Sequence, residues 1–488
     1  MQTSKIINQT ENKVVLNRNF SLSTHSVRSL LNLLFLFPLS SFRKKLLIKT
    51  YLIDRSKKIQ KDFYEKQSFN GNDYSLADFG WSLATDNDIF DKVKRLWRYF
   101  VFVRDNKQYT YRRVLRSKND HKVSIDCPFN NSPKEMIMMA SNDYLGLSNH
   151  DSVRKAISHA VLHESAGSAS VPMLSGTYTA TKDLEKKIAN FYSREKAMVF
   201  PSGYAANVGI ISAIVNRGDL VLGDRLNHAS IQDGIKLSGA KCIKYDHNDL
   251  DQLESILETV HMKHKRILIV ADGVFSMDGD VVDLPRMCSI ARKYNARTMI
   301  DEAHAIGVIG RNGKGTEEYF DMTGQVDIMM GTLSKTIGQI GGYVAGSKDL
   351  ICHLRHYSRS YFFSTALPPY VCRGIIEVFN VLEREQDRVE SIKSNINYFK
   401  SRCIERGLPI EKATISAIIP LVVGDEAKLK ELSYKVHEKG IYTNPIPFPA
   451  VAKDKTRFRI SLMATHTKEE MDYVIDTFYT LFKEHNII

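Results

Sequence analysis

Short apolar runs alternate with amphipathic helical patterns from about residue 134 onward. The apolar runs are typical of buried strands and lie at 197–200, 220–222, 241–245, 267–271, 298–300 and 328–330. The amphipathic patterns predict helices at 183–192, 206–216, 250–261 and 284–294. Alternation of this kind predicts βαβ units and a mainly parallel sheet, so we expect an α/β fold. In such sheets, ligands gather at the carboxyl ends of the strands.

The pattern divides the chain into four parts. Residues 1–60 form a basic extension, partly polar and partly amphipathic, and residues 61–135 read as an N-terminal arm or small subdomain. We expect a large domain over 136–366, where the alternation is strongest. Longer helical patterns and a few short strands over 367–488 predict a small α/β C-terminal domain.

The net charge of +13 would suggest a nucleic-acid partner if it were spread over the chain. Residues 1–60 hold 11 Lys/Arg and 2 Asp/Glu, which is +9 of that total. The remaining residues therefore carry only a small excess, and we expect no nucleic-acid partner. No apolar run approaches the roughly 18 residues that would span a bilayer.

The basic extension contains an apolar run at 30–37 and the cluster Arg43, Lys44 and Lys45. An apolar face flanked by Lys and Arg suits the plane of an anionic membrane, so residues 28–60 predict peripheral membrane contact by a cytoplasmic enzyme. A basic segment nearly without acids is also typical of a cleaved targeting peptide. A helix packed on the body of the enzyme is the third interpretation, and the sequence leaves all three open.

The most informative stretch is 331–346, GTLSKTIGQIGGYVAG, which follows the apolar run 326–330. A lysine in a loop is usually a solvated charge, but Lys335 stands among small residues. Thr332 and Ser334 offer hydroxyls to an oxyanion, and the glycines let the backbone approach a ligand. A desolvated lysine can lose its charge and attack an aldehyde. These residues predict a pyridoxal 5'-phosphate enzyme in which Lys335 forms the imine.

Polar motifs follow other expected strands. Ser202 stands where a strand turns into a helix, and the exposed amides of such a turn would suit a phosphate, although a plain helix cap is the simpler interpretation. His228 could stack on an aromatic cofactor or serve as a hydrogen-bonded structural residue. Asp272 opens a polar turn, 272–280, that is typical of an ordinary Asx/Gly turn.

The motif Asp301-Glu302-Ala303-His304 lies at the end of a buried strand. A buried carboxylate needs a cationic partner, and a protonated pyridinium nitrogen would serve Asp301. His304 could then reach the phenolic oxygen of the ring. Asp-Glu-Ala-His is also the metal-binding box of a helicase class, but the phosphate loop that this class requires is missing from the sequence. We expect no metal.

Seven motifs in order give the chain a family resemblance. They lie at 140–145, 202–207, 227–230, 272–280, 301–305, 331–335 and 362–369. The series resembles the α-oxoamine synthases, which are fold-type I pyridoxal phosphate enzymes, over roughly 135–488. The resemblance implies a large domain with a mainly parallel seven-stranded sheet between helices, a small C-terminal domain and a homodimer.

The resemblance also implies residue roles. Lys335 would form the imine with the cofactor and later move the α-proton, His228 would stack on the ring, and Asp301 would pair with its nitrogen. His304 would lie on the ring's oxygen side. The implied cofactor-binding residues are Ser202, Gly203, Tyr204, Asp272, Ser276, Thr332, Ser334, Ser364 and Thr365, the last two from the other subunit. Asn142 and Arg459 match the groups that bind the amino-acid carboxylate, for which a guanidinium is suited by its bidentate geometry.

The implied reaction is the decarboxylative condensation of a small amino acid with an acyl thioester. The stretches 442–451 and 461–467 look most like serine palmitoyltransferases, so we expect L-serine and a long-chain acyl-CoA, and with them sphingolipid base synthesis and lipid metabolism. Pro172 and Thr181 depart from the family pattern at positions expected on the substrate side.

Three alternatives stay open. Another α-oxoamine synthase would use glycine or alanine, as in glycine C-acetyltransferase, 8-amino-7-oxononanoate synthase or an amino-ketone signal synthase, with acyl-CoA or acyl carrier protein as donor. A plain aminotransferase would need no thioester. A non-catalytic partner subunit usually loses the imine lysine, and Lys335 is present.

Overall fold

The structure is a computed structural model, and it describes residues 58–59, 70–83, 85–410 and 414–488. Apart from residues 58 and 59, the expected membrane segment 28–60 lies outside the described residues. The chain divides into two units, Met1–Arg98 and Tyr99–Ile488. None of the described helices is both long and apolar enough to cross a membrane.

The described part of the first unit contains two 3₁₀ turns, η2 (Gly71–Asp73) and η3 (Leu76–Phe79), and the start of helix α3 (Asp91–Asp105). A buried ion pair joins Arg95 on α3 to Asp86 in the preceding segment, with Nη2 donating to Oδ2 at 2.8 Å. The hydrogen bond from Arg95 lowers the pKa of Asp86. This pair holds the helix start to the segment before it.

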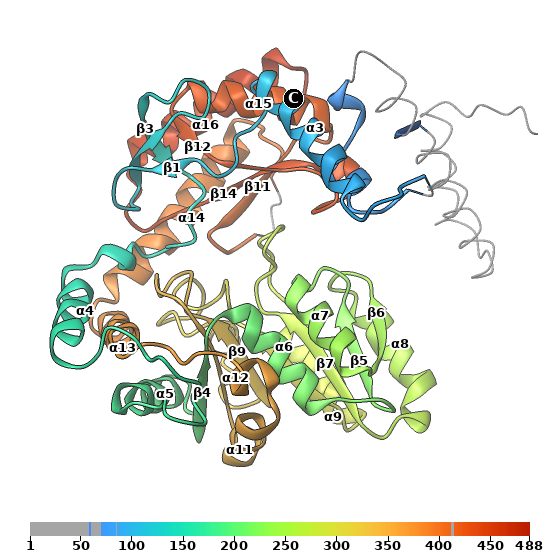
Figure 1. The fold of residues 1–488 in the computed structure, drawn as a ribbon, viewed down its shortest axis with the longest axis vertical. Coiled ribbons are helices and arrows are strands. Elements are labelled where there is room, and N and C mark those ends of the chain that lie inside the picture. The colour runs from blue at the N-terminus through green and yellow to red at the C-terminus, as the bar shows by residue number, and fades with distance from the viewer. Residues whose placement is uncertain (1–57, 60–69, 84, 411–413) are drawn as a thin grey trace, which may run out of the picture. The chain divides into compact units, whose positions relative to one another are not determined.

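A seven-stranded sheet forms the centre of the second unit (Figure 1). Its strands, in spatial order, are β4 (Lys196–Phe200), β10 (Gly342–Gly346), β9 (Ile328–Thr332), β8 (Arg297–Asp301), β7 (Ile267–Asp272), β5 (Leu220–Asp224) and β6 (Lys241–Tyr245). Strands β9, β8, β7, β5 and β6 pair in parallel, while β10 is antiparallel to both of its neighbours. The structure confirms the expected α/β fold with a mainly parallel seven-stranded sheet.

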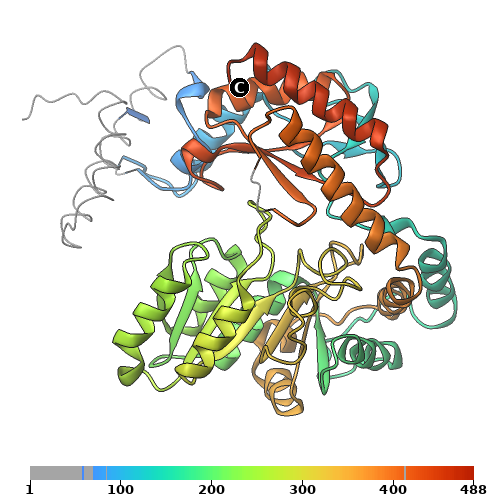
Figure 2. The same ribbon diagram turned by 180° about the vertical axis from the view of Figure 1, so that it is seen from behind.

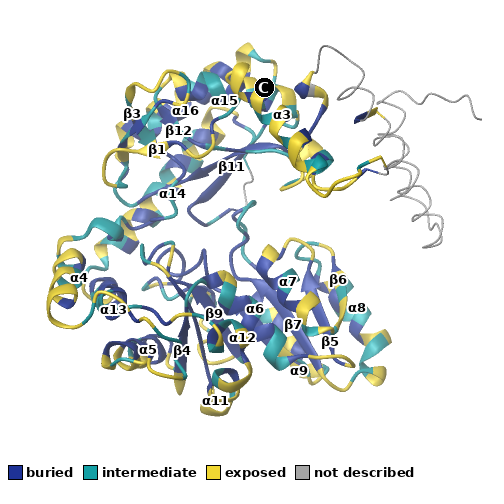
Figure 3. Cartoon of the chain, in the orientation of Figure 1, coloured by how far each residue is buried: buried dark blue, intermediate teal, exposed yellow. Residues whose placement is uncertain are grey.

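Helices cover both faces of this sheet, as the alternation of side chains along its strands requires. On β7, Leu268 and Val270 pack with the helices of one face, α6 (Gly203–Ile214) and α7 (Ala229–Ser238). Ile267 and Ile269 point to the other face. The helices on that side are α8 (Leu250–Val260) and α9 (Leu284–Lys293). Most of the strands are accordingly buried, although the edge strand β6 is largely exposed, and the outer helix faces are exposed as well (Figure 3).

The remaining helices of the large domain flank this centre. They are α4 (Asp151–His163), α5 (Thr179–Phe191), α10 (Thr316–Tyr319), α11 (Lys348–Tyr357) and α12 (Arg359–Phe362). Helix α13 (Pro369–Arg384) packs on both α4 and α5, and α14 (Asp387–Glu405) follows it. The C-terminal helices are α15 (Glu426–Glu438) and α16 (Lys468–Glu484), and α16 lies against α14 (Figure 2).

Two small sheets complete the second unit. One is antiparallel, with the strand order β11 (Ile418–Val422), β14 (Arg457–Ser461) and β13 (Asn444–Ile446). The other has the order β1 (Val114–Leu115), β2 (Lys122–Asp126), β3 (Pro133–Met138) and β12 (Ile441–Tyr442). Strand β12 pairs in parallel with β3, so the strands before residue 139 are completed by a strand from the C-terminal region.

Candidate active site

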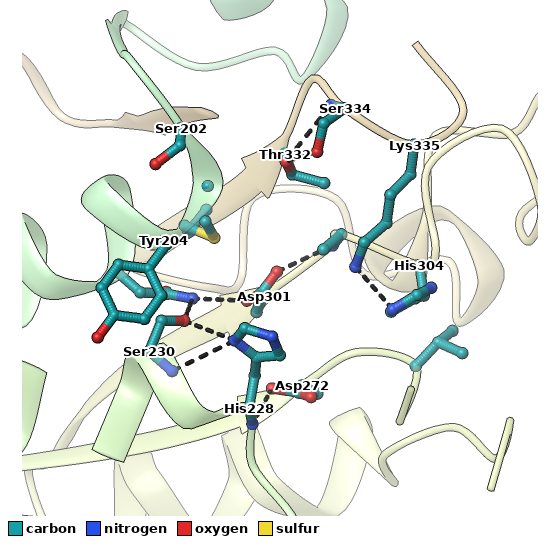
Figure 4. Close-up of a pocket in the computed structure, with 15 residues that line it drawn as sticks. Ser202, Tyr204, His228, Ser230, Asp272, Asp301, His304, Thr332, Ser334 and Lys335 are labelled. Atoms are coloured by element: carbon teal, nitrogen blue, oxygen red, sulfur yellow. Dashed lines mark hydrogen bonds between the residues drawn. The ribbon is translucent and has the colours of Figure 1, made fainter. Parts of the chain in front are cut away.

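A cavity of ≈ 250 Å³ opens at the carboxyl ends of the central strands (Figure 4). Asp272 ends β7, Asp301 ends β8 and Thr332 ends β9, while His228 follows β5. Ten of the predicted residues line this cavity: Ser202, Gly203, Tyr204, His228, Asp272, Asp301, His304, Thr332, Ser334 and Lys335. The sheet therefore brings together polar groups that are far apart along the chain.

Asp301 is a buried carboxylate held by two donors. The side-chain amide of Asn207 donates to its Oδ2 at 2.7 Å, and the backbone N–H of Ala303 donates to its Oδ1 at 2.9 Å. No lysine or arginine forms an ion pair with it among the described residues. A carboxylate arranged in this way is ready to pair with a cationic group of a ligand, as expected for a pyridinium nitrogen.

Ser230 joins His228 to this group. Asn207 donates to Ser230 Oγ at 2.9 Å, and Ser230 Oγ lies 2.7 Å from Nδ1 of His228. The backbone N–H of Ser230 also donates to that Nδ1, at 3.3 Å, so Nδ1 acts as an acceptor and the proton of the neutral ring sits on Nε2. Burial, aided by the positive charge of Lys335, lowers the pKa of His228. A neutral, oriented ring is suited to stacking on a flat ligand.

Asp272 is hydrogen-bonded to the backbone of His228. Its Oδ1 accepts the backbone N–H of His228 at 3.3 Å, and its own N–H donates to Asn227 Oδ1 at 3.1 Å. Burial, with the nearby charge of Asp301, raises the pKa of Asp272 well above its usual value. Asp272 is thus a positioning group at the cavity wall.

Lys335 contacts His304 at the wall of the cavity. Its Nζ lies 2.6 Å from Nε2 of His304, and Nδ1 of the same ring lies 2.6 Å from the hydroxyl of Tyr144. Burial lowers the pKa of Lys335 to about 8. The negative charge of Asp301 opposes this shift, and the positive charge of Arg459 adds to it. Burial, with the charge of Lys335, holds the pKa of His304 well below its usual value. The cavity therefore presents an amine that loses its proton near neutral pH.

The start of α6 borders the cavity. Ser202 caps this helix by accepting the N–H of Ala205 at 3.0 Å, which leaves the first backbone amides of the helix directed toward the cavity end. Thr332 Oγ1 and Ser334 Oγ lie 2.8 Å apart beside it. A Cβ built on Gly203 would come within 2.7 Å of Thr332 Oγ1, so only glycine allows these two segments to approach so closely.

Asn142 and Arg459 lie outside the cavity lining but contact each other. Both Nη1 and Nη2 of Arg459 donate to Asn142 Oδ1 at 3.3 Å, and Nε donates to the carbonyl oxygen of Ser276 at 2.6 Å. Ser276 therefore holds Arg459 through its backbone and does not line the cavity. Tyr144 connects the pair to the cavity, since its hydroxyl donates to Asn142 Oδ1 at 3.2 Å.

Three other predicted positions also lie away from the cavity lining. Ser364 is half-buried and Thr365 is exposed, and their role in another subunit stays a prediction. Thr181 is buried in α5, where its hydroxyl lies 4.0 Å from Cys372 Sγ on α13. That departure from the family pattern falls in a helix–helix contact, so the structure gives it no role in the cavity.

Three residues of the site were not predicted from the sequence: Asn207, Ser230 and Tyr144. Each stands within one of the seven motifs. Asn207 and Tyr144 have hydrogen-bond partners in distant segments, whereas Ser230 contacts His228 two positions away. Asn207 and Asp301 are 94 positions apart, and Tyr144 and His304 are 160. Asn207 and Tyr144 are almost fully buried polar groups, which requires a hydrogen-bond partner but does not identify it.

The residues present fit pyridoxal phosphate. The helix start with its two neighbouring hydroxyls suits a phosphate, the Asp301 carboxylate suits a protonated ring nitrogen, and the Lys335 amine suits an aldehyde. Oδ1 of Asn207 is buried without a hydrogen-bond partner among the described residues, which leaves an acceptor beside the cavity. When bound, this cofactor supplies an electron sink for the carbanion that forms at an amino-acid α-carbon.

Comparisons with known proteins agree with this chemistry. Residues 134–478 match the family model of class I and II aminotransferases. The 8-amino-7-oxononanoate synthase of Thermoanaerobacter pseudethanolicus is 42% identical over 78% of this chain and 95% of its own length. The 4-hydroxy-2,2'-bipyrrole-5-methanol synthase PigH of a Serratia species is 40% identical over 79% of this chain and 59% of its own length.

The fold comparison gives the same family. The structure of Sphingomonas wittichii serine palmitoyltransferase superimposes with a TM-score of 0.78 at 28% identity, covering 82% of this chain and all of that one. The expected cofactor and fold are confirmed, and the helicase interpretation of residues 301–304 is wrong. The chain belongs to the α-oxoamine synthases, pyridoxal phosphate-dependent acyltransferases with the fold of the class I and II aminotransferases.

Proposed function

We propose that this enzyme joins the α-carbon of a small amino acid to an acyl group from a thioester, with loss of the amino-acid carboxyl group as carbon dioxide. A carbon–carbon bond forms to the acyl carbonyl, the carbon–sulfur bond breaks and the thiol leaves. The amino ketone keeps the nitrogen and side chain of the amino acid.

The observation that carries this proposal is the environment of Arg459. The side chain is 5% exposed, and its partners are the carbonyl of Ser276, the amide oxygen of Asn142 and the hydroxyl of Ser461, at 2.9 Å. No carboxylate pairs with it among the described residues, although a buried charge is costly without a counterion. An amino-acid carboxylate would supply that counterion, at a position coupled to Lys335.

The other side chains have roles that follow from their surroundings. Lys335, as a neutral amine, accepts the α-proton, and His304 lies within hydrogen-bond distance of the same nitrogen. His228 shields one side of the cavity, and the carboxylate of Asp301 would hold a protonated ring nitrogen of the cofactor. Arg459 and Asn142 fix the carboxylate, so the bond to be broken is held in one orientation.

L-Alanine is the amino acid that the sequence relatives favour. An 8-amino-7-oxononanoate carries its amino group next to a terminal methyl group, which corresponds to the α-carbon and side chain of alanine. The rest of its chain corresponds to a seven-carbon acyl group that ends in a carboxylate. We therefore propose alanine with a medium-length acyl thioester as the leading pair, in place of the serine expected from the sequence.

L-Serine with a long-chain acyl-CoA is the second candidate. It is supported by the TM-score of 0.78 with a serine palmitoyltransferase. The 40% identity with PigH, whose name describes a bipyrrole product, supports testing other pairs of substrates as well. Relatives of nearly equal identity thus differ in product, and identity alone does not choose the substrate.

The same reasoning extends to partners. We propose a homodimer in which Ser364 and Thr365 complete the site of the other subunit, supported by their absence from the lining of their own cavity.

We also propose peripheral contact of residues 28–60 with anionic membranes, supported by the +9 charge of residues 1–60. Removal of residues 1–60 should reduce cosedimentation with phosphatidylserine vesicles, and unchanged cosedimentation would contradict the membrane role.

A product screen by mass spectrometry tests the proposed reaction. The purified enzyme with added pyridoxal phosphate is offered alanine, serine, glycine or threonine, each with short, medium, ω-carboxylated and long acyl-CoA and with the corresponding carrier-protein thioesters. An amino ketone that requires both substrates, and is absent with Lys335→Ala, supports the proposal. A keto acid formed without any thioester would make the enzyme an aminotransferase, and no product from any pair would overturn the proposal.

A further inference from the structure

Tyr144 lies between the two functional groups of the site and belongs to neither. The residue is fully buried in the segment that follows β3, and its hydroxyl lies 2.6 Å from Nδ1 of His304. The same hydroxyl lies 3.2 Å from Oδ1 of Asn142. One buried oxygen therefore contacts both the histidine beside Lys335 and the amide beside Arg459.

The direction of these hydrogen bonds follows from proton counting. Arg459 donates twice to Oδ1 of Asn142, which marks that atom as the amide oxygen and leaves the amide NH₂ pointing elsewhere. The hydroxyl of Tyr144 must then donate to Oδ1. Burial raises the pKa of Tyr144, so the hydroxyl keeps the proton that this bond needs.

The other bond of the hydroxyl is consequently an accepting one. Since Tyr144 uses its only proton on Asn142, it accepts the Nδ1–H of His304. A neutral His304 then has its lone pair on Nε2, facing Lys335 Nζ at 2.6 Å. The direction of every bond from Lys335 to Asn142 is thus set by the one hydroxyl.

We propose that Tyr144 is a positioning residue that couples the carboxylate site to the lysine–histidine pair. Its hydroxyl holds His304 in the tautomer whose Nε2 can accept a proton from Lys335, and it holds the Asn142 amide with its NH₂ group available to the amino-acid carboxylate. This proposal depends on the proposed function in one respect, which is that the bound carboxylate belongs to an amino acid.

Tyr144→Phe removes this oxygen and little else. It leaves the buried Nδ1–H of His304 without an acceptor and removes one donor from Asn142 Oδ1. A buried polar group left unpaired costs about 1–3 kcal/mol, which corresponds to roughly 5- to 150-fold in an equilibrium constant. His304 can relieve that cost by changing tautomer, which would turn an N–H toward Lys335.

The matched control is Tyr192→Phe. Tyr192 is buried, and its hydroxyl lies 2.5 Å from that of Tyr343, away from the cavity lining. Both substitutions remove one buried hydroxyl from a tyrosine with a close polar partner. A general loss of packing or stability would therefore affect both variants, whereas the coupling is specific to Tyr144.

The test uses the cofactor-loaded enzyme without any thioester. Absorbance of the cofactor is followed against pH, and L-alanine or L-serine is titrated at fixed pH. We expect Tyr144→Phe to weaken amino-acid binding about tenfold and to move the midpoint of the pH titration, while Tyr192→Phe changes neither. Values within twofold of wild type in both measurements for Tyr144→Phe would overturn the coupling.

A second measurement needs no substitution at Tyr144. The ¹⁵N chemical shifts of His304 in the full-length enzyme freed of cofactor, in which Lys335 keeps its free amine, should show a protonated Nδ1 and an unprotonated Nε2, with His304→Asn used to assign the signals. The opposite tautomer would overturn the proposal even if Tyr144→Phe failed to fold. Because neither measurement includes a thioester, a failed product screen would count against the proposed function and not against the role of Tyr144.

Discussion

Asn207 and Asp301 form the central polar contact of the site, with Nδ2 of the amide 2.7 Å from Oδ2 of the carboxylate. Asn207 lies on the second turn of α6, and Asp301 ends β8. The same amide group donates to Ser230 Oγ, which in turn contacts His228. One asparagine therefore orients both the carboxylate and, through the serine, the imidazole that is expected to lie over the cofactor ring.

We expect Asn207→Ala to weaken pyridoxal phosphate binding about 10- to 100-fold. The substitution removes a hydrogen bond to a charged group, which contributes roughly 1.5–3 kcal/mol. Cofactor affinity is measured by titrating the apoenzyme and following absorbance. Asn395→Ala is the control, because the amide of Asn395 is bonded to the carbonyl oxygens of Met463, Ala464 and His466 and does not line the cavity. Equal affinity in Asn207→Ala and wild type would contradict this role.

Lys335 should form an imine with pyridoxal phosphate unusually fast near neutral pH. Its pKa is lowered to about 8, mainly by burial, so the reactive neutral amine is present well below the pH at which an ordinary lysine deprotonates. We expect the rate of imine formation with the apoenzyme to rise through pH 8 and then level off. Lys335→Ala should bind the cofactor without forming an imine and should make no product.

Two observations would contradict that account. One is a rate that keeps rising to about pH 10.5, the ordinary value for lysine. The other is a borohydride-reducible bond in Lys335→Ala. Lys348→Ala, at an exposed position, serves as the control for the loss of a positive charge.

The strands were predictable because their core sides are apolar and their lengths are bounded by polar turns. The sequence runs 267–271 and 328–330 lie within β7 and β9 as expected. Strand β10 was not predicted, because Gly342 and Gly346 frame only three larger residues within a segment that reads as a loop. Tyr343 and Val344 are nevertheless fully buried, since the strand lies between β4 and β9.

The residues of the site could be predicted where the groups that act together lie close together in the sequence. Lys335 with Thr332 and Ser334 forms one short motif, and the sheet edge gathers the motifs that follow its strands. The pairing of Tyr144 with His304 was not predictable, because a hydrogen bond between distant segments leaves no periodic signal. The order of the motifs supplied the family resemblance, but the fold that the family shares does not identify the amino-acid substrate.

A second cluster of charged side chains, partly buried, should make stability fall at alkaline pH. His247 bridges two carboxylates, with Nδ1 3.1 Å from Asp224 Oδ2 and Nε2 2.9 Å from Asp280 Oδ2. Burial alone would lower the pKa of His247, but the hydrogen bonds of both aspartates raise it to about 10. Asp246 and Arg225 carry the neighbouring charges and pair with each other at 3.1 Å.

The sign of the effect follows from the higher pKa in the folded state. The histidine binds its proton more tightly when folded than when unfolded, so its contribution is complete below about pH 6.5 and is lost as pH rises toward 10. We expect His247→Gln to lower the free energy of unfolding by about 2–4 kcal/mol at pH 6 and by much less at pH 10. Urea unfolding at several pH values measures this difference.

His150→Gln is the matched control, since His150 has one carboxylate neighbour, Glu385, at 3.3 Å. The decrease in the free energy of unfolding caused by His247→Gln could instead stay constant between pH 6 and pH 10. That result would show that His247 stabilises the fold mainly by packing against Phe275, whose ring centroid lies 4.4 Å away.

Shared active sites can be detected by mixing two inactive variants. Lys335→Ala loses the amine, and the double variant Ser364→Ala, Thr365→Ala loses the two hydroxyls that are proposed to reach the partner's cofactor. In a heterodimer of the two, one site has both changes and the other has neither. Random reassociation makes half of the dimers heterodimers, so the mixture should recover about a quarter of wild-type activity.

Mixing Lys335→Ala with Asp301→Ala provides the control, because Lys335 and Asp301 line the same cavity of one chain. Each site of that heterodimer keeps one of the two defects, so no activity should return. If the first mixture also stays inactive while native mass spectrometry shows heterodimers, Ser364 and Thr365 do not complete the partner's site. Recovery in the first mixture alone would establish that each cavity needs both subunits, which explains why these two hydroxyls lie away from the cavity of their own chain.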